Sequence, residues 1–267
     1  MNQTSLPPVV RFQQNAVLEA EGITVAWSGV RALDGVSLHV GADEIVGLIG
    51  PNGAGKTTLI NVLTGYVRPL AGTILLHGRD VTRTSPRHRA RSGMVRTFQD
   101  VRMFVGLTVQ ESILVSAEVA GGSRRVARAR VSELMDLFDL AGLSRQVCEV
   151  LSYGQQRRLA IARSLATRPA VLLLDEPAAG LNDAETDALG QEILRIPELA
   201  GCGILLIEHN MGLVNTVCSW LHVLDNGTEI FQGEPRDAFA NPGVRDAYIG
   251  HGFSSRIALD LEAEGPS

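Results

Sequence analysis

The sequence predicts an α/β fold: a parallel sheet with helices on both faces and an all-helical subdomain inserted into it. Three short apolar runs, at residues 45–49, 171–174 and 203–208, are typical of buried strands. Segments whose apolar residues recur at helical spacing lie between these runs. Strands that alternate with helices indicate a parallel sheet covered on both sides.

An abrupt turn and a helix follow the first predicted strand. Gly50 ends the apolar run, and Leu59, Ile60 and Leu63 recur at helical spacing toward Gly65. The glycine-rich segment after Gly50 therefore joins a strand to a helix.

A different pattern occupies about residues 106–142, where strand signals are absent. The apolar residues there follow one face of a helix: Ala127, Val131, Leu134, Met135 and Phe138. We expect this segment to be the inserted helical subdomain. Four arginines are expected to form its solvated face: Arg124, Arg125, Arg128 and Arg130.

Composition excludes several classes of protein. Hydrophobic residues make up 45% and charged residues 20% of the chain, values that argue against disorder or a fibrous protein. No apolar run approaches the roughly 18 residues that a membrane span needs, so a membrane role would depend on partners. A net charge of -5 argues against a nucleic-acid surface.

The N-terminus indicates a cytoplasmic location, and the cysteines show no pattern of a zinc site or a redox pair. Residues 1–16 are polar and lack the basic and apolar regions of a secretion signal. Cys148, Cys202 and Cys218 are odd in number and lack paired spacing, so we expect small buried apolar residues.

The segment after the first strand matches the phosphate-binding pattern G-x-x-x-x-G-K-[ST]. Its residues are Gly50, Pro51, Asn52, Gly53, Ala54, Gly55, Lys56, Thr57 and Thr58. Glycines let backbone N–H groups turn inward around a phosphate, and the following helix offers its positive N-terminus. Lys56, the only lysine of the chain, would contact the β- and γ-phosphates, and the Thr57 hydroxyl would bind Mg²⁺. The pattern predicts ATP and Mg²⁺ as ligands.

The second strand delivers two carboxylates, Asp175 and Glu176, at its end. Asp175 would hold Mg²⁺ through water, and Glu176 would orient the attacking water or accept its proton. An apolar run before Asp-Glu is common at strand ends and mostly structural. Downstream of a phosphate loop it indicates a hydrolytic site.

Residues 151–155, Leu-Ser-Tyr-Gly-Gln, stand just ahead of the second strand. They resemble the signature sequence Leu-Ser-Gly-Gly-Gln of the ABC ATPase family, with Tyr153 in place of glycine. In that family the signature loop of one subunit caps the ATP held by another. The resemblance therefore implies that Ser152, Gly154 and Gln155 bind ATP across a dimer interface. A small hydroxyl and a glycine at a helix N-terminus suit an anion.

The resemblance also implies an architecture. It is a P-loop NTPase core with a parallel sheet, an N-terminal antiparallel β subdomain and an α-helical subdomain at about residues 101–152. The ABC ATPase domain would span residues 17–250. A disordered extension at residues 1–16 and a flexible tail at residues 251–267 would flank it.

Four more residues stand at positions that matter in this family. Gln99 resembles the glutamine that joins Mg²⁺ and the attacking water, and His209 resembles the switch histidine that contacts the γ-phosphate. Trp27 matches the aromatic residue that stacks on adenine, and Asn182 stands where the family usually has aspartate. Away from the family pattern, a lone glutamine is usually on the surface and a lone histidine is usually structural. The alternative for Trp27 is a core or surface tryptophan without a role in binding.

Longer matches point to the ATPases of branched-chain amino-acid importers. They are Arg-Thr-Phe-Gln at 96–99, Leu-Ser-Tyr-Gly-Gln-Gln-Arg-Arg at 151–158 and Asp-Glu-Pro-Ala-Ala-Gly-Leu-Asn at 175–182. Close relatives of these importers include urea importers and lipopolysaccharide exporters. The stretch between Gln99 and Ser152 is shorter than those importers usually carry.

The resemblance implies partners and a location. The partners are a second ATPase subunit, identical or paralogous, two transmembrane permease subunits and, for an importer, an extracytoplasmic substrate-binding protein. The chain would be peripheral, on the cytoplasmic face of the inner membrane, and no nucleic-acid partner is expected.

Two other classes are open. A soluble ABC ATPase that transports nothing usually joins two ATPase units or inserts a long coiled coil, and neither is evident here. A non-catalytic nucleotide-gated regulator is disfavoured by the joint presence of Glu176, Gln99 and His209.

Overall fold

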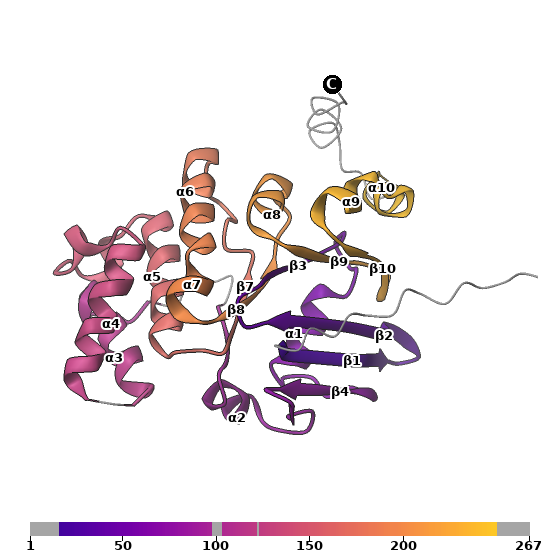
Figure 1. Ribbon diagram of the computed structural model, residues 1–267, viewed down its shortest axis with the longest axis horizontal. Coiled ribbons are helices and arrows are strands. Elements are labelled where there is room, and N and C mark those ends of the chain that lie inside the picture. Colours follow the sequence, from indigo (N-terminus) through magenta and orange to yellow (C-terminus); the bar gives the residue numbers. More distant parts are fainter. Residues whose placement is uncertain (1–15, 98–102, 122, 250–267) are drawn as a thin grey trace, which may run out of the picture.

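The strands of the computed structural model, which describes residues 16–97, 103–121 and 123–249, form two sheets (Figure 1). The smaller sheet is antiparallel with the order β2-β1-β4-β5. Its strands are β1 (Ala16–Trp27), β2 (Val30–Gly41), β4 (Ala71–Leu76) and β5 (Arg79–Asp80).

The larger sheet carries the candidate site and has the order β10-β9-β3-β8-β7-β6. Its strands are β3 (Ile45–Ile49), β6 (Met94–Arg96), β7 (Val171–Asp175), β8 (Gly203–Ile207), β9 (Trp220–Asp225) and β10 (Thr228–Gly233). Five of them are parallel, and β10 pairs with β9 in the antiparallel sense at one edge. β3, β7 and β8 are the three strands predicted from the apolar runs.

The central strands are apolar on both faces because the large sheet separates two cores. In β7, Val171 and Leu173 pack toward the antiparallel sheet, while Leu172 and Leu174 pack toward the other core. This alternation between two buried faces explains why the strand reads as an uninterrupted apolar run.

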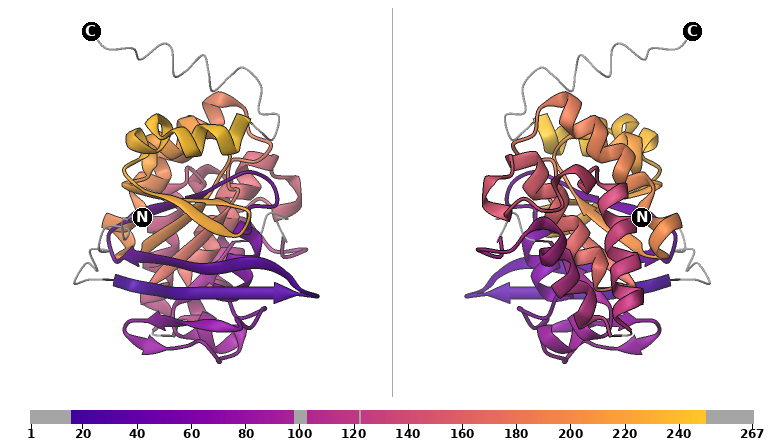
Figure 2. Two further views of the ribbon diagram at one scale, coloured as in Figure 1. Left: turned by 90° about the vertical axis from the view of Figure 1, so that its right-hand side faces the viewer. Right: turned by 90° about the vertical axis from the view of Figure 1, so that its left-hand side faces the viewer.

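The helices cover both faces of the large sheet. They are α1 (Lys56–Leu63), α2 (Pro86–Arg91), α3 (Val109–Val119), α4 (Arg124–Leu137), α5 (Tyr153–Ala166), α6 (Asp183–Leu194), α7 (Ile196–Ala200), α8 (Met211–Val217), α9 (Pro235–Ala240) and α10 (Pro242–Ile249). Two short 3₁₀ turns complete the described elements: Ala141–Leu143 and Cys148–Val150. α1 packs in the core that holds the antiparallel sheet. Figure 2 shows that sheet and the yellow C-terminal helices on opposite sides of the molecule.

Helices α3, α4 and α5 pack together at one end of the molecule (Figure 1). The five apolar residues predicted to share one helical face in this region are all buried. Because α5 belongs to this group, the helical region continues past residue 152. The antiparallel sheet and these helices confirm the predicted fold class.

One prediction about this region is wrong. Arg124, Arg125 and Arg128 are exposed as expected, but the Arg130 side chain is only 12% exposed. Its guanidinium donates to the Leu165 carbonyl of α5, because α4 packs against α5 at this point.

Three further predictions concern the cysteines, membrane spans and the two termini. All three cysteines are buried and free, as expected. Among the described residues, no helix combines the length and the apolar composition that crossing a bilayer requires. The predicted terminal segments, 1–16 and 251–267, lie outside the described residues, except that Ala16 already begins β1.

Candidate functional site

The loop between β3 and α1 is shaped by glycines at positions where a side chain would be strained. Gly50 has a φ of 149°, and a Cβ there would lie 2.1 Å from the Leu224 carbonyl oxygen. Gly55, the N-cap of α1, has a φ of 104° and provides no side-chain cap. The first backbone N–H groups of α1 are therefore free of a side-chain acceptor, which is the condition for binding an anion.

Lys56 is buried within this loop. Its Nζ donates to the carbonyl oxygens of Gly50 at 2.6 Å and Pro51 at 3.0 Å. Burial lowers the Lys56 pKa, whereas the charges of Glu176 and Asp175 raise it. The ammonium group is thus held by neutral acceptors close to two carboxylates, and a phosphate would be a stronger partner than either carbonyl.

A pocket of ≈ 190 Å³ opens over the phosphate loop. It is lined by Ala32, Asn52, Gly53, Ala54, Gly55, Lys56, Thr57, Thr58, Glu176 and His209. The structure therefore brings most of the predicted phosphate-binding residues together with two predicted catalytic residues from distant parts of the chain. Trp27 does not line this pocket; it lies at the end of β1 and is 51% exposed.

Glu176 and His209 contact each other at the carboxyl ends of adjacent strands. β7 and β8 pair in parallel, with Asp175 opposite Ile207, so the residues that follow emerge side by side. The His209 Nε2 lies 3.0 Å from the Glu176 Oε1. Glu176 has a φ of 47°, a conformation that costs a non-glycine residue about 1 kcal/mol or more and is typical of functional sites.

Asp175 is paired with a residue that the sequence analysis gave no role of its own. Arg96, at the end of β6, donates through Nη2 to the Asp175 Oδ2 at 2.6 Å and through Nη1 to the Asn61 Oδ1 of α1 at 2.9 Å. A hydroxyl on Thr57 and a carboxylate on Asp175 are the hard oxygen ligands that Mg²⁺ takes, so the donor set fits that ion. Gln99, the third predicted ligand, lies outside the described residues.

Glu208 is a functional candidate that the sequence reasoning missed. It is 3% exposed and accepts hydrogen bonds from the N–H groups of Ala178, His209 and Asn210. Burial raises its pKa, and the three N–H donors oppose that shift. The signal in the sequence was a carboxylate directly after four apolar strand residues, immediately before the predicted switch histidine.

The signature segment forms the N-terminus of α5, and it does not line the pocket. Ser152 is the N-cap: its hydroxyl accepts from the Gln155 N–H, and the Gln155 Oε1 accepts from the Ser152 N–H. Both Ser152 and Tyr153 are exposed, while Gly154 is buried. Ser152, Gly154 and Gln155 are therefore not among the residues that line the pocket of their own chain.

The two residues that depart from the family pattern have structural partners. The Tyr153 hydroxyl accepts from Arg157 Nη2 at 2.5 Å, and its ring packs so closely on Gly180 that a Cβ there would lie 3.0 Å from it. Asn182 caps α6 by accepting from the Glu185 N–H at 3.0 Å. Asn182 thus supplies a hydrogen bond without a charge.

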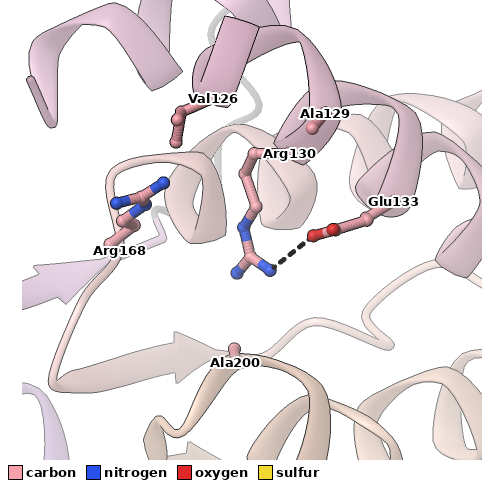
Figure 3. A pocket seen from close by; sticks show the side chains of 6 residues that line it. All are labelled: Val126, Ala129, Arg130, Glu133, Arg168 and Ala200. Carbon is pink, nitrogen blue, oxygen red and sulfur yellow. Dashed lines mark hydrogen bonds and ion pairs between the residues drawn. The ribbon is translucent and has the colours of Figure 1, made fainter. Parts of the chain in front are cut away.

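A second and larger hollow, of ≈ 310 Å³, lies away from this chemistry (Figure 3). Val126, Ala129, Arg130, Glu133, Arg168 and Ala200 line it. Arg130 is 3.5 Å from Glu133, and the hollow contains none of the predicted site residues. The pocket over the phosphate loop is smaller, but it brings predicted phosphate-binding and catalytic residues together.

Comparison with known proteins agrees with this geometry. The sequence model of the ABC transporter family matches residues 33–179, which is more than half of the chain. The high-affinity branched-chain amino acid transport ATP-binding protein BraF of Pseudomonas aeruginosa is 39% identical over 249 residues, covering 88% of this chain and 98% of that protein. LivG of Escherichia coli, which has the same descriptive name, gives the same identity and coverage.

Solved structures agree as well. The ADP conformation of MJ1267, an ATP-binding cassette of an ABC transporter, has a TM-score of 0.76 and 30% identity, covering 88% of this chain and 99% of that one. The cbiO1 subunit of the cbiONQ transporter complex from Clostridium perfringens has a TM-score of 0.79 and 27% identity, covering 93% and 100%. Family match, relatives and fold agree with the phosphate loop and its facing carboxylate: this chain belongs to the ABC transporter family and is one of its ATPase subunits.

Proposed function

We propose that this chain hydrolyses ATP to energise the import of branched-chain amino acids. The substrate class comes from the relatives, which are named as branched-chain amino acid transport ATP-binding proteins and match almost end to end. The alternatives considered from sequence were a urea or amide importer, a lipopolysaccharide exporter and a soluble ABC ATPase. No observation on the described residues favours any of these three.

The observation that carries the hydrolytic role is the contact between Glu176 and His209 at the mouth of the phosphate loop. Lys56 and the open N-terminus of α1 bind the β- and γ-phosphates. Glu176 orients the attacking water or accepts its proton, and His209, 3.0 Å from Glu176, contacts the γ-phosphate. Both side chains are about a quarter exposed, so water reaches them.

Mg²⁺ is the cofactor that we assign with ATP. Thr57 and Asp175 would hold it, and Gln99 is the third predicted ligand. When bound, the ion neutralises charge that develops on the transferred phosphate. Trp27, exposed on β1, would stack on the adenine once nucleotide is bound.

A complete site requires a second ATPase subunit. Ser152, Gly154 and Gln155 do not reach the pocket of their own chain, so they would act on the ATP held by the partner subunit. ATP that binds the closed pair better than the open pair would drive closure. The bound permeases would follow this motion between inward-facing and outward-facing states.

The remaining partners follow from the proposed transport. Two transmembrane permease subunits would bind the chain at the cytoplasmic face of the inner membrane, where the chain would be peripheral. An extracytoplasmic substrate-binding protein would deliver the amino acid.

The catalytic assignment is tested by Glu176→Gln. We expect phosphate release to fall by roughly 10²-fold or more, as for loss of a general base, while binding of a fluorescent ATP analogue stays unchanged. Glu133→Gln, on the exposed face of α4, is the matched control with normal turnover. Wild-type turnover by the Glu176 variant would refute its assigned role.

The substrate assignment needs the assembled transporter. Proteoliposomes that contain this chain with its co-purifying permeases, supplied with the substrate-binding protein, should take up radiolabelled leucine in an ATP-dependent way. Uptake of urea in place of leucine, or co-purification with no membrane protein, would overturn it.

A further inference from the structure

We propose that Glu208 is a positioning residue that locks the Glu176 loop to the His209 loop. This inference rests on the proposed roles of Glu176 and His209 and adds a residue that touches neither ATP nor water itself. Its basis is a buried carboxylate that connects the two loops through backbone hydrogen bonds.

The carboxylate contacts both loops at once. Its Oε1 accepts from the Ala178 N–H at 2.8 Å, two residues after Glu176. Its Oε2 accepts from the His209 N–H at 3.0 Å and the Asn210 N–H at 3.3 Å. One oxygen therefore serves the loop after β7, and the other serves the loop after β8.

Two further contacts connect these loops. The Glu176 N–H donates to the Ile207 carbonyl at 2.9 Å, and the side chains of Glu176 and His209 meet at 3.0 Å. Glu176 also has its φ of 47°, a conformation that persists only where the surroundings hold it. Glu208, which is 3% exposed, supplies that restraint through its hydrogen bond with the Ala178 N–H.

The arrangement requires two acceptor oxygens on the Glu208 carboxylate, one for each loop. An ionised glutamate has two acceptor oxygens, whereas glutamine has one oxygen and one amide that can only donate. In Glu208→Gln, the side-chain NH₂ group would face the backbone N–H groups of one loop. These buried donors would then have no acceptor, which is unfavourable. The variant keeps the size of the side chain and breaks the link on one side.

The experiment compares Glu208→Gln with Glu44→Gln. Glu44 is the matched control because its carboxylate also accepts a backbone N–H, from Gly41 at 2.9 Å, at a position outside the candidate site. For Glu208→Gln we expect kcat to fall about tenfold or more with the Kd for ATP unchanged within about twofold, because a misplaced group mainly affects the chemical step. Glu44→Gln should retain wild-type kcat.

A spectroscopic measurement separates positioning from general destabilisation. The chain has six histidines, so the ring nitrogens can be followed by NMR after labelling with ¹⁵N-histidine, and His209→Ala identifies the His209 signals. The His209 ring signals should shift in Glu208→Gln and in Glu176→Gln, but not in Glu44→Gln. If Glu208→Gln does not fold, Glu208→Asp, which keeps the charge but is too short to serve both loops, should show the same shift.

The outcomes are distinct. Unchanged His209 signals with wild-type kcat in Glu208→Gln would overturn the positioning role, and so would parallel losses of ATP binding, kcat and thermal stability. If Glu176→Gln and His209→Ala themselves hydrolyse ATP normally, the proposed function fails rather than this inference alone.

Discussion

The N-termini of α1 and α5 are both candidate phosphate-binding ends, yet their backbone N–H groups are treated in different ways. α1 begins after Gly55, which leaves the first turn without a side-chain cap. α5 begins after Ser152, and the reciprocal hydrogen bonds between Ser152 and Gln155 close its first turn. One helix end is open to an anion in the isolated chain, and the other is already capped.

This difference suggests that the two helix ends act at different steps, one in ATP binding and the other in hydrolysis. The α1 end can bind phosphate as soon as ATP arrives, since nothing has to be displaced there. At the α5 end an incoming phosphate has to compete with the Ser152 and Gln155 side chains or use the remaining N–H groups. ATP binding should therefore depend on the N-terminus of α1. The N-terminus of α5 should affect the rate of hydrolysis in the closed pair of subunits.

The largest expected effect comes from removing the cation at the open end. Lys56→Ala should reduce hydrolysis by roughly 10²–10³-fold, as for loss of a group that stabilises charge in the transition state. Isothermal titration should show weaker ATP binding, by a factor of about 10–100, for loss of a charge-assisted hydrogen bond.

Lys56→Arg refines this prediction. Lys56 is only 7% exposed and lies between backbone carbonyls, so the larger planar guanidinium should not fit in its place. We expect the arginine variant to be nearly as impaired as the alanine variant. Wild-type turnover in it would mean that charge alone matters at this position.

An intermediate effect is expected at the capped end. Ser152→Ala should lower hydrolysis by roughly tenfold or more, as for a lost transition-state contact, and leave ATP binding by the single chain unchanged. Ser123→Ala is the control, because the Ser123 hydroxyl likewise accepts a backbone N–H, from Val126, at the start of α4. Each substitution should cost about 1 kcal/mol of stability by chemical denaturation, as for other N-caps. Equal hydrolysis in the two variants would remove any special role for Ser152.

The smallest effect concerns proton binding at Lys56. Burial lowers its pKa from the ordinary value of 10.5, so the folded protein presents neutral amine at a lower pH than an unfolded chain does. The charged form costs stability at neutral pH, and this cost disappears as pH rises through 10.5.

Amine acetylation followed by mass spectrometry measures this directly, because Lys56 and the N-terminal amine are the only primary amines. In protein without nucleotide, Lys56 labelling should rise with pH earlier than in the urea-unfolded chain. Mg-ATP should protect Lys56 and leave the N-terminal amine reactive. Equal labelling with and without nucleotide would contradict the phosphate-loop assignment.

Features encoded by adjacent residues could be predicted from the sequence. The phosphate loop and the strands that deliver Asp175 and His209 each depend on a short stretch of chain, so pattern and spacing were sufficient. The antiparallel pairing of β10 with β9 could not be predicted, because the sequence of a short strand does not show the direction of its neighbour.

Contacts between distant segments were not predictable in this way. The link from Arg96 to Asp175 spans 79 positions, and the link from Glu208 to Ala178 spans 30. The helical pattern predicted a solvated Arg130, but its environment depends on how α4 packs against α5. Such pairs are fixed by packing, which no local periodicity encodes.

The buried cysteines have a practical consequence for observing the closure of two subunits. Burial raises the pKa of the Cys202 and Cys218 thiols to about 12, and Cys148 is also fully buried. Thiolate is the reactive form, so native thiols should resist maleimide dyes at neutral pH. A single cysteine introduced at an exposed position such as Val30 should then carry a fluorophore selectively. The three native cysteines would not have to be removed before the distance between subunits is measured.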